Sequence, residues 1–489
     1  MRIDAWSKDD RIDWILLRAQ LEGPDFFARV QAPEETDPQV YVGECSNAVF
    51  SLLKKNYAPR RTRALAAAAR LEKVPEMLTI ARGNLTRPVK LYAKLAIDAA
   101  RGGDDLYNTS LMTLADSLSP AERARLVSAR DRAVRGLHEF ADWLEKGMPT
   151  MPDWKPMGEV NYNYLLKNVL LLPLNATQVE MLGQVELGRY RGLEAMLKDP
   201  SFASPDPARS RSVPRDQAAF LAAYEGRERE MMDFLAARKL VTIPPYIGPF
   251  MIRQLPEAFK PTSPGGFMNP PGQYDRDPSG FYFIPTYDPK SANFYIRAAI
   301  EDPRPLLGHE GIPGHFLQLS IANHLPDEIR RQQNDGGAAS AGVFVEGWAL
   351  YTEEMLLREG LYPDNSPSHG QVLRLSRYRA ARVGADVNLH TGRWTFEQAV
   401  KYFMEAGGLD REAAEGEAAG AASSPSQKIW YMVGKWQIMQ LLGRYRDQQG
   451  ANFRLGAFHD QLLSYGSLPV SVIQWLMVDD ATAVNAVLR

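Results

Sequence analysis

The chain has 489 residues, and its 57 basic and 59 acidic side chains leave a formal net charge of −2 at pH 7. Because both signs are mixed along the chain, the sequence offers no field that would collect nucleic acid or an anionic membrane, and it contains no nucleic-acid motif. Cys45 is the single cysteine, so no intrachain disulfide can form. The length allows a large buried core, in one helical domain or in several lobes.

Neither a membrane span nor a leader peptide is visible in the sequence. No stretch approaches the ~18 consecutive apolar residues that a spanning helix needs. The opening residues, MRIDAWSKDDRIDWILL, lack the basic region, apolar core and cleavage site of a secretory signal. We expect a cytoplasmic protein, or a periplasmic or secreted one from which a leader was removed. The sequence does not indicate its oligomeric state.

Helical signals dominate the first half of the chain, so we expect a mainly α protein. Residues 61–82 are rich in strong helix formers. Ser119, followed by a proline, predicts the N-cap of a helix that runs to about Glu145. Further helices are expected over residues 176–198 and 214–240.

The stretch SFASPDPARSRSVP, residues 201–214, is the best linker candidate by composition. It predicts an N-terminal helical lobe over residues 1–200 and a second helical lobe over residues 215–489. The second lobe contains the histidine motif described below and is therefore expected to be the catalytic one. One continuous domain is the alternative.

A short region rich in aromatic residues precedes that motif. GFYFI at residues 280–284 and NFYI at 293–296 resemble two strands around a turn, which predicts a small β-hairpin at the cleft edge. Tyr282 and Tyr295 on these strands are candidate substrate-binding residues, because an exposed strand can hold an extended peptide by backbone pairing. A packing ribbon that binds no ligand is an equally good interpretation.

The most informative segment is HEGIPGH, residues 309–315, where two imidazoles flank a glutamate. A catalytic zinc needs three protein ligands, an open position for water and a base beside that water. At roughly 100° per residue, a regular helix would point His309 and His315 to different sides. Pro313 and Gly314 can supply the distortion that brings His315 back toward His309.

Glu346 opens a second apolar segment, which runs to Arg358 and is typical of a mostly buried helix. This carboxylate either favours the positive helix N-terminus or is the third zinc ligand, which would leave Glu310 free to deprotonate the water. Of Glu353 and Glu354, we expect one on a solvated face and the other orienting a ligand histidine.

These two motifs resemble HExxPGH and EGWALY of the bacterial family catalogued as domain of unknown function 885. Residues 379–390 (RAARVGADVNLH) and 425–434 are similar to further blocks of that family, and the resemblance covers about residues 8–480. It implies an all-helical, zincin-like metallopeptidase fold that binds one Zn²⁺ per chain through the histidines of the first motif and the glutamate of the second. It implies no known substrate.

The sequence departs from the family pattern outside the metal motifs. Ser426 replaces a glycine and Lys428 an alanine of one block, and Gly420-Ala421 replaces an Arg-Tyr pair. A third departure, at residues 288–292, precedes the first motif. We expect these changes to affect substrate specificity and to leave the metal chemistry intact.

Four residues of these blocks are candidates for handling the substrate. Negative charge develops on the carbonyl oxygen during amide hydrolysis, and His390 and Tyr431 are the candidate donors to it. Asp386, four residues before His390, would orient that imidazole; a surface Asp-His pair and a core tyrosine are the alternatives. Arg379 and Arg382 are either bidentate ligands of a substrate carboxylate or structural ion-pair partners.

Together these features predict a zinc-dependent hydrolase of peptide or related amide bonds, with Glu310 as general base. A peptide or small amide is the expected partner. The alternatives are a hydrolase of non-peptide amides or esters, a non-catalytic metal-binding scaffold, and an iron enzyme with two histidines and one carboxylate.

Overall fold

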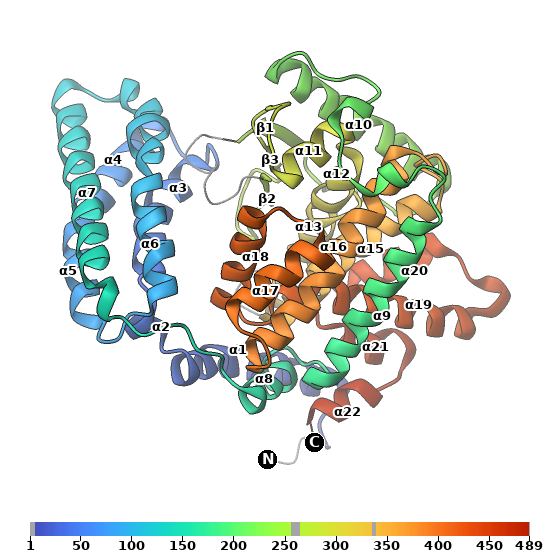
Figure 1. Cartoon of the computed structure of the whole chain (residues 1–489). Coiled ribbons are helices and arrows are strands. Elements are labelled where there is room, and N and C mark those ends of the chain that lie inside the picture. Colours follow the sequence, from blue (N-terminus) through green and yellow to red (C-terminus); the bar gives the residue numbers. More distant parts are fainter. Residues whose placement is uncertain (1–4, 256–264, 335–338, 489) are drawn as a thin grey trace.

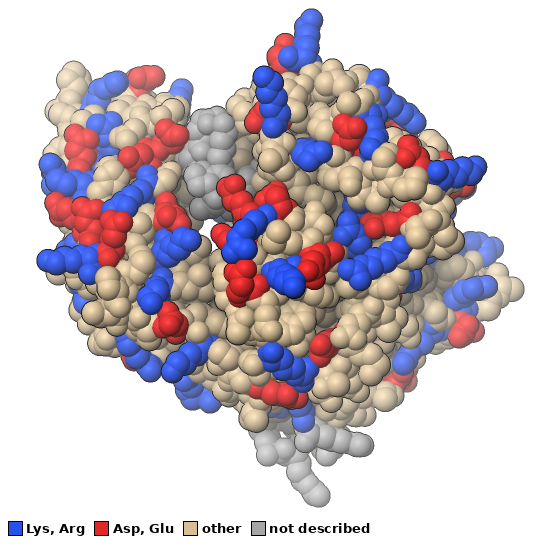
Figure 2. Space-filling view, viewed as in Figure 1, with Lys and Arg blue, Asp and Glu red and all other residues tan. Residues whose placement is uncertain are grey.

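The structure is a computed structural model that describes residues 5–255, 265–334 and 339–488. Across these residues the protein is mainly helical and has one three-stranded sheet, so the expectation of a mainly α protein is confirmed. None of the described helices combines the length and the apolar character required to cross a membrane. Acidic and basic side chains are interspersed over the face shown in Figure 2.

Five helices stand apart from the rest of the molecule as a separate lobe (Figure 1). They are α3 (Gln39–Leu53), α4 (Arg60–Leu71), α5 (Val74–Asn84), α6 (Lys90–Gly102) and α7 (Pro120–Gly147), with a π-helix (Leu106–Ser110) and a 3-10 helix (Leu111–Ser117) before α7. Their buried side chains, from Tyr41 to Leu144, form a hydrophobic cluster of their own. We call this unit the α3–α7 lobe.

Two predictions fall in this lobe. The predicted N-cap is confirmed, because the Ser119 side chain and Glu122 form a capping box at the start of α7. The single helix expected over residues 61–82 is instead two helices, α4 and α5, with Pro75 in the first turn of the second. Proline is favoured at the first helical position, and here it starts a new helix.

Four other N-terminal helices pack with the C-terminal half of the chain, in a unit we call the main body. They are α1 (Lys8–Val30), α8 (Glu159–Tyr164), α9 (Ala176–Ala195) and α10 (Gln217–Arg238), with short 3-10 or π-helices at Leu165–Val169, Pro200–Ala203 and Pro207–Arg209. The short helix α2 (Pro33–Thr36) and the 3-10 helix at Met148–Thr150 contact the α3–α7 lobe instead. Side chains of α1 and α9 share hydrophobic clusters with helices beyond residue 339. The cores therefore separate the α3–α7 lobe from the main body, and they do not divide the chain at residues 201–214.

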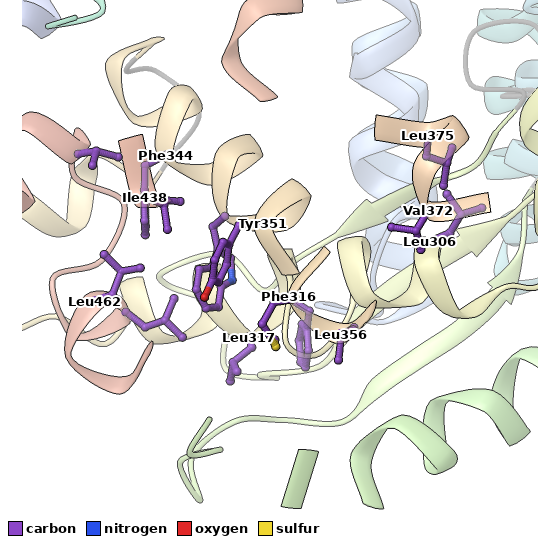
Figure 3. Close-up of a cluster of buried hydrophobic side chains, with 14 of the residues drawn as sticks. Leu306, Phe316, Leu317, Phe344, Tyr351, Leu356, Val372, Leu375, Ile438 and Leu462 are labelled. Carbon is purple, nitrogen blue, oxygen red and sulfur yellow. The ribbon is translucent and has the colours of Figure 1, made fainter. Parts of the chain in front are cut away.

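The second half of the main body is a tightly packed set of helices. They are α11 (Phe294–Glu301), α12 (Arg304–Glu310), α13 (His315–Ala322), α14 (Glu328–Gln332), α15 (Ala339–Arg358), α16 (Pro367–His390), α17 (Phe396–Tyr402), α18 (Arg411–Ser423), α19 (Trp430–Gln449), α20 (Leu455–Ser464), α21 (Val470–Val478) and α22 (Thr482–Leu488), with short π- or 3-10 helices at Phe403–Gly407, Gln427–Ile429 and Gly450–Asn452. Figure 3 shows part of their shared core, in which Phe316, Leu317 and Leu356 lie together. This core supports α12, α13 and α15 from one side.

The sheet lies next to α10 and α11 and has the order β1-β3-β2 (Figure 1). Its strands are β1 (Phe250–Gln254), β2 (Phe267–Asn269) and β3 (Gly280–Ile284), of which β1 runs parallel and β2 antiparallel to β3. The strand predicted at 280–284 is confirmed, but the hairpin is wrong. Residues 294–296 instead begin α11, because the side chain of the N-cap residue Asn293 accepts hydrogen bonds from the backbone N–H groups of Tyr295 and Ile296.

Helices α15 and α19 cross with their backbones in contact. A Cβ on Gly434 would lie 1.9 Å from the carbonyl oxygen of Val343, and one on Gly347 would lie 2.4 Å from the carbonyl carbon of Gly434. Only glycine allows backbones to approach this closely. The crossing places Glu346 of α15 beside the first turn of α19, where Tyr431 lies.

Candidate metal centre

Three predicted ligands from three helices meet at one point. His309 lies in the last turn of α12, His315 is the first residue of α13, and Glu346 lies within α15. Their ligand atoms all lie within 4.8 Å of one another, and Oε2 of Glu346 is 3.5 Å from Nε2 of His309 and 3.4 Å from Nε2 of His315. Tetrahedral zinc with bonds of about 2.0–2.2 Å separates its ligand atoms by roughly 3.3–3.6 Å. The three residues therefore fit a zinc ion.

Unpaired buried atoms in the cluster support the same fit. Among the described residues, neither Oε2 of Glu346 nor Nδ1 of His315 has a hydrogen-bond partner, although both atoms are buried. Buried polar atoms in proteins are almost always paired, so an unpaired carboxylate oxygen between two imidazoles is a position that a cation would satisfy.

The predicted distortion between the histidines is present. Helix α12 ends at Glu310, α13 begins at His315, and the peptide bond before Pro313 is cis. A Cβ on Gly314 would lie 1.9 Å from the carbonyl oxygen of His309, so only glycine fits at that position. The indole Nε1 of Trp348 donates to the Pro313 carbonyl oxygen at 2.8 Å, which connects the second motif to the loop of the first.

Glu346 does not head its helix, as one interpretation of the sequence required. The structure begins α15 at Ala339, so Glu346 lies about two turns inside the helix. Stabilisation by the helix N-terminus falls off within the first turn and does not explain this carboxylate. The position of Glu346 facing His309 and His315 explains why a carboxylate stands here.

The first ligand is oriented by a buried ion-pair chain. Nδ1 of His309 is 2.8 Å from Oε1 of Glu353, and Nη2 of Arg379 is 3.1 Å from the same oxygen. Because the carboxylate accepts the Nδ1 proton, Nε2 is left to face Glu346 and a metal. The expectation that one of the two adjacent glutamates orients a histidine thus holds for Glu353.

Glu354 is not on a solvated face, as was expected for the other glutamate. It is buried, accepts hydrogen bonds from Arg189 at 3.0 and 2.8 Å and from the Tyr190 hydroxyl at 2.6 Å, and pairs with Lys435. Helix α15 therefore has carboxylates with two separate tasks at adjacent positions.

The charges of the ligand cluster are strongly coupled. Burial alone would lower the pKa of His309, but the nearby carboxylates of Glu346 and Glu353 outweigh burial and raise this pKa to about 9. Burial would raise the pKa of Glu346, yet His315 and His309 hold that pKa well below its usual range. A metal ion that binds here has to displace the His309 proton, so the affinity of the cluster for metal falls as the pH is lowered.

Glu310, the expected base, is half-buried next to the ligand His309 at the end of α12. Burial and, to a smaller extent, nearby charges that include Glu310 raise the pKa of Tyr224 and of Tyr282. Tyr282 is only 1% exposed. It therefore does not lie on an open strand where it would contact substrate.

Tyr431 lies directly against the ligand cluster. Its ring is nearly parallel to that of His309, with the ring centroids 6.2 Å apart and the planes at 17°. Its hydroxyl accepts a hydrogen bond of 3.2 Å from the side-chain amide of Gln427. Burial and the nearby Glu346 charge raise the pKa of Tyr431, so the hydroxyl stays protonated.

His390 lies in a different environment. Its Nε2 donates to the carbonyl oxygen of Ala421 at 2.8 Å, and its ring stacks on that of Tyr162. The Asp386 carboxylate that was expected to orient it accepts instead from the Tyr162 hydroxyl and from backbone N–H groups of residues 426 and 428. These contacts join α16 to its neighbours and engage Nε2 of His390 with the protein backbone.

Arg379 and Arg382 occur as ion-pair partners. Arg379 meets Glu353, as described above, and Arg382 binds Glu417 with two hydrogen bonds of 3.0 and 2.9 Å. Arg382 also donates to the hydroxyls of Tyr378 and Tyr295, which is how Tyr295 of α11 reaches the site. Both guanidinium groups lie near the Tyr431 ring, at 5.6 and 5.1 Å from its centroid.

Comparison with known proteins identifies the family. Residues 2–477 match the family described as "Bacterial protein of unknown function (DUF885)". The chain belongs to this family. The DUF885 resemblance of the two motifs thus extends over nearly the whole sequence.

Two solved structures have the same fold as this DUF885 protein. One is described as "a putative lipoprotein of unknown function from Shewanella oneidensis"; it has a TM-score of 0.72 and 25% identity, covering 98% of this chain and 89% of the other. The second is described as "the putative lipoprotein from Colwellia psychrerythraea" and has a TM-score of 0.69 and 22% identity over 86% of this chain and 76% of the other. A search of curated proteins finds no match.

Sequence reasoning missed two residues of the DUF885 site. Glu417, which holds Arg382, lies in an Ala/Gly-rich helix and gives no motif of its own. Tyr378, which accepts from the same guanidinium, was not singled out either. The available signal was a carboxylate beside small, buried residues of α18, because such a charge needs a buried partner.

Proposed function

We propose that this DUF885 protein is a zinc-dependent hydrolase of peptide or related amide bonds. The observation that supports this most directly is the meeting of His309, His315 and Glu346, with Glu310 adjacent to the first ligand. Three protein ligands leave one position of a tetrahedral ion open, which distinguishes catalytic from closed structural zinc sites. A purely structural zinc would not need Glu310.

The residues have distinct roles in the proposed reaction. When bound, zinc supplies a Lewis acid that lowers the pKa of a water molecule at the open position to about 7. Glu310 takes the proton of the attacking water and delivers it to the leaving amine. The protonated Tyr431 hydroxyl, beside His309, donates to the carbonyl oxygen as negative charge develops there. Glu353 keeps the His309 ring oriented.

The same residues would serve an ester or a non-peptide amide, because the attack of water on the carbonyl is the same. A library of peptides digested by the zinc-loaded protein, with cleavage sites read by mass spectrometry, tests hydrolysis and specificity together. Cleavage that stops when zinc is removed and returns when it is restored is the expected result. Absence of cleavage across the library contradicts the peptidase proposal.

The metal is tested separately by elemental analysis of protein purified without chelators. We expect about one zinc per chain, lost in His309→Ala and in Glu346→Ala, because each substitution removes one of three ligands. Iron in place of zinc would favour the alternative of a two-histidine, one-carboxylate iron enzyme. Full zinc occupancy in either variant would show that the metal is held elsewhere.

We also propose that the protein works in the cell envelope, because both solved relatives are described as lipoproteins. Fractionation of cells that express the native gene tests this location. Recovery of the protein in the cytosolic fraction alone would contradict it.

A further inference from the structure

A charged cluster lies beside the Tyr431 ring. It consists of Arg382, Glu417 and Lys428, and we call it the Lys428 cluster. The guanidinium of Arg382 is 5.1 Å from the centroid of the Tyr431 ring, and the ring of His309 is 6.2 Å from that centroid. Tyr431 therefore contacts both the cluster and the candidate metal centre.

The two cations of the cluster are satisfied to different degrees. Arg382 has two hydrogen bonds to Glu417 and donates to two tyrosine hydroxyls at 2.7 and 3.0 Å. The ammonium of Lys428 meets Oε2 of Glu417 at 3.4 Å, and that oxygen already accepts from Nε of Arg382. An ammonium has three N–H donors, so Lys428, with this ion pair at 3.4 Å, retains donor capacity.

The ammonium of Lys428 packs against Gly420. A Cβ at position 420 would be 3.3 Å from Nζ, so a larger residue there would crowd the ammonium. The Lys428 side chain is 13% exposed, so the group is nearly buried without being closed off. Desolvated cations are costly unless paired, and a ligand carboxylate would complete the pairing.

A second donor on the same side of the metal centre lacks a partner. Arg379 is 4% exposed, lies 5.6 Å from the centroid of the Tyr431 ring, and its Nε has no hydrogen-bond partner among the described residues. Its Nη2 is held by Glu353. Arg379 lies beside the Tyr431 ring, and Lys428 belongs to the cluster that contacts this ring through Arg382, so two nearly buried cations with unmet donors lie in this region.

We propose that Lys428, held in place by Glu417, binds a free carboxylate of the substrate, so that the enzyme removes residues from the C-terminal end of short peptides or N-acyl amino acids. This inference rests on the proposed hydrolase function. One residue of extended chain spans about 3.3–3.6 Å. Because the Lys428 cluster and the metal centre both lie next to Tyr431, a substrate that contacts both has one or two residues between its scissile amide and its carboxylate.

Binding to the zinc-loaded Glu310→Gln variant tests the inference without turnover. Isothermal titration calorimetry would compare N-acetylated dipeptides as free acids with the same dipeptides as C-terminal amides. We expect the free acid to bind about 10- to 100-fold more tightly, the usual effect of a hydrogen-bonded charge pair. Adding Lys428→Met should remove most of this preference by weakening acid binding alone, whereas Lys428→Arg should retain it.

Three results would overturn the inference: equal affinity for acid and amide, an acid preference that survives Lys428→Met, or no binding of the free acid at about 10 mM. The acid-to-amide comparison in protein with Lys428 intact decides the matter even if the methionine variant does not fold. Lys73→Met is the matched control, since Lys73 is 76% exposed and pairs with Glu76 in the α3–α7 lobe. It should leave the preference unchanged.

The kinetic version separates the two proposals. In the protein with Glu310 intact, Lys428→Met should raise KM for free acids more than KM for the matching amidated peptides. Cleavage of acids and amides at equal rates rejects the carboxylate subsite and leaves the hydrolase proposal standing. Discrimination in binding without any hydrolysis rejects the hydrolase proposal and leaves the carboxylate site standing.

Discussion

The Nδ1 of His309, the carboxylate of Glu353 and the guanidinium of Arg379 form one buried line from a metal ligand to the middle of α16. The carboxylate has no solvent to replace either partner, because its side chain is fully buried. Partners of this kind fix the ring and the tautomer of a ligand histidine. The orientation of His309 therefore depends on a residue that binds no metal.

Glu353→Gln should weaken zinc binding about 10- to 100-fold, the usual cost of losing such a partner. Competition with a fluorescent zinc chelator measures the affinity, and circular dichroism shows whether the variant stays folded. Zinc affinity equal to that of the parent, in a folded variant, would mean that Glu353 only balances the charge of Arg379.

Glu354→Gln should act on stability and leave the metal affinity almost unchanged. Burial would raise the pKa of Glu354, but Lys435 and Arg189 hold it well below its usual range. Breaking a buried pair of this kind costs about 3 kcal/mol of unfolding free energy, measured by urea denaturation. Because the folded-state pKa is lowered, this contribution is complete at pH 7 and shrinks as the pH falls below about 4.3, the ordinary glutamate value.

The exposed Glu76, whose side chain is 63% accessible, provides the control for this experiment. Glu76→Gln should change stability by less than about 1 kcal/mol, as surface pairs do. A loss of zinc binding in Glu354→Gln, at unchanged stability, would contradict the separation of tasks along α15.

The sequence predicted which residues form the candidate site, but not which side chains surround them. His309, Glu310, His315 and Glu346 stand in two short motifs, so local spacing was enough to find them. The meeting of Gly420 with Lys428 was not predictable, although both positions depart from the family pattern. Their contact is made between the end of α18 and the turn before α19, and no local pattern records such a contact.

At the scale of elements, glycines set the geometry of the site. Gly314 allows α13 to start against the end of α12, and Gly347 with Gly434 allows α15 and α19 to touch. The sequence predicted a distortion at Gly314, because proline and glycine interrupt helices. It gave no sign of the α15–α19 crossing, since glycines within helical patterns do not show which helix they will face.

Gly314→Ala should disrupt the metal centre, because the new Cβ would meet the His309 carbonyl oxygen at 1.9 Å and force α12 and α13 apart. We expect zinc affinity to fall at least about 10-fold, as it does when ligand orientation is lost. Equilibrium zinc titration of the folded variant measures the effect. Because of this contact, alanine at position 314 would not simply join α12 and α13 into one regular helix.

Gly188→Ala on α9 is the matched control, because nothing lies within 4 Å of the added Cβ. It should leave zinc binding unchanged and raise stability by about 0.5–1 kcal/mol, since alanine is the better helix former. Equal zinc affinity in the Gly314 and Gly188 variants would mean that the junction of α12 and α13 relaxes without moving His315.

At the scale of the whole molecule, the α3–α7 lobe and the main body have separate hydrophobic cores. The three proposed metal ligands all lie in the main body. The units also touch, for example through the Tyr92 hydroxyl, which donates to the Ala422 carbonyl oxygen at the end of α18. Figure 2 shows a hollow between lobe and main body on one face.

This division could not be read from composition. The stretch at residues 201–214 looked like a linker because it is rich in serine and proline, but Arg297 and Arg374 donate to backbone carbonyls of residues 205 and 202 and hold it against the main body. Likewise, α1 joins the C-terminal helices through the ion pairs of Lys8 with Asp479 and of Arg330 with Asp9. Contacts over several hundred residues leave no local pattern in a single sequence.

Calorimetry of the zinc-loaded and zinc-free proteins tests the division. We expect two unfolding transitions, of which only one moves when zinc is removed, because a ligand stabilises the unit that binds it. Zinc at about 100 times its Kd should contribute roughly 2.7 kcal/mol to that unit. A single transition, or equal shifts of both, would show that lobe and main body unfold together.

The comparison of Glu310→Gln with the parent, at equal zinc content, tests the central claim most directly. The substitution keeps the size of the side chain and all three metal ligands but removes the base, so zinc should stay bound while peptide cleavage falls by roughly 10²–10⁴-fold. Peptide cleavage by the zinc-loaded variant at the rate of the parent would contradict the assignment of Glu310 and, with it, the proposed mechanism.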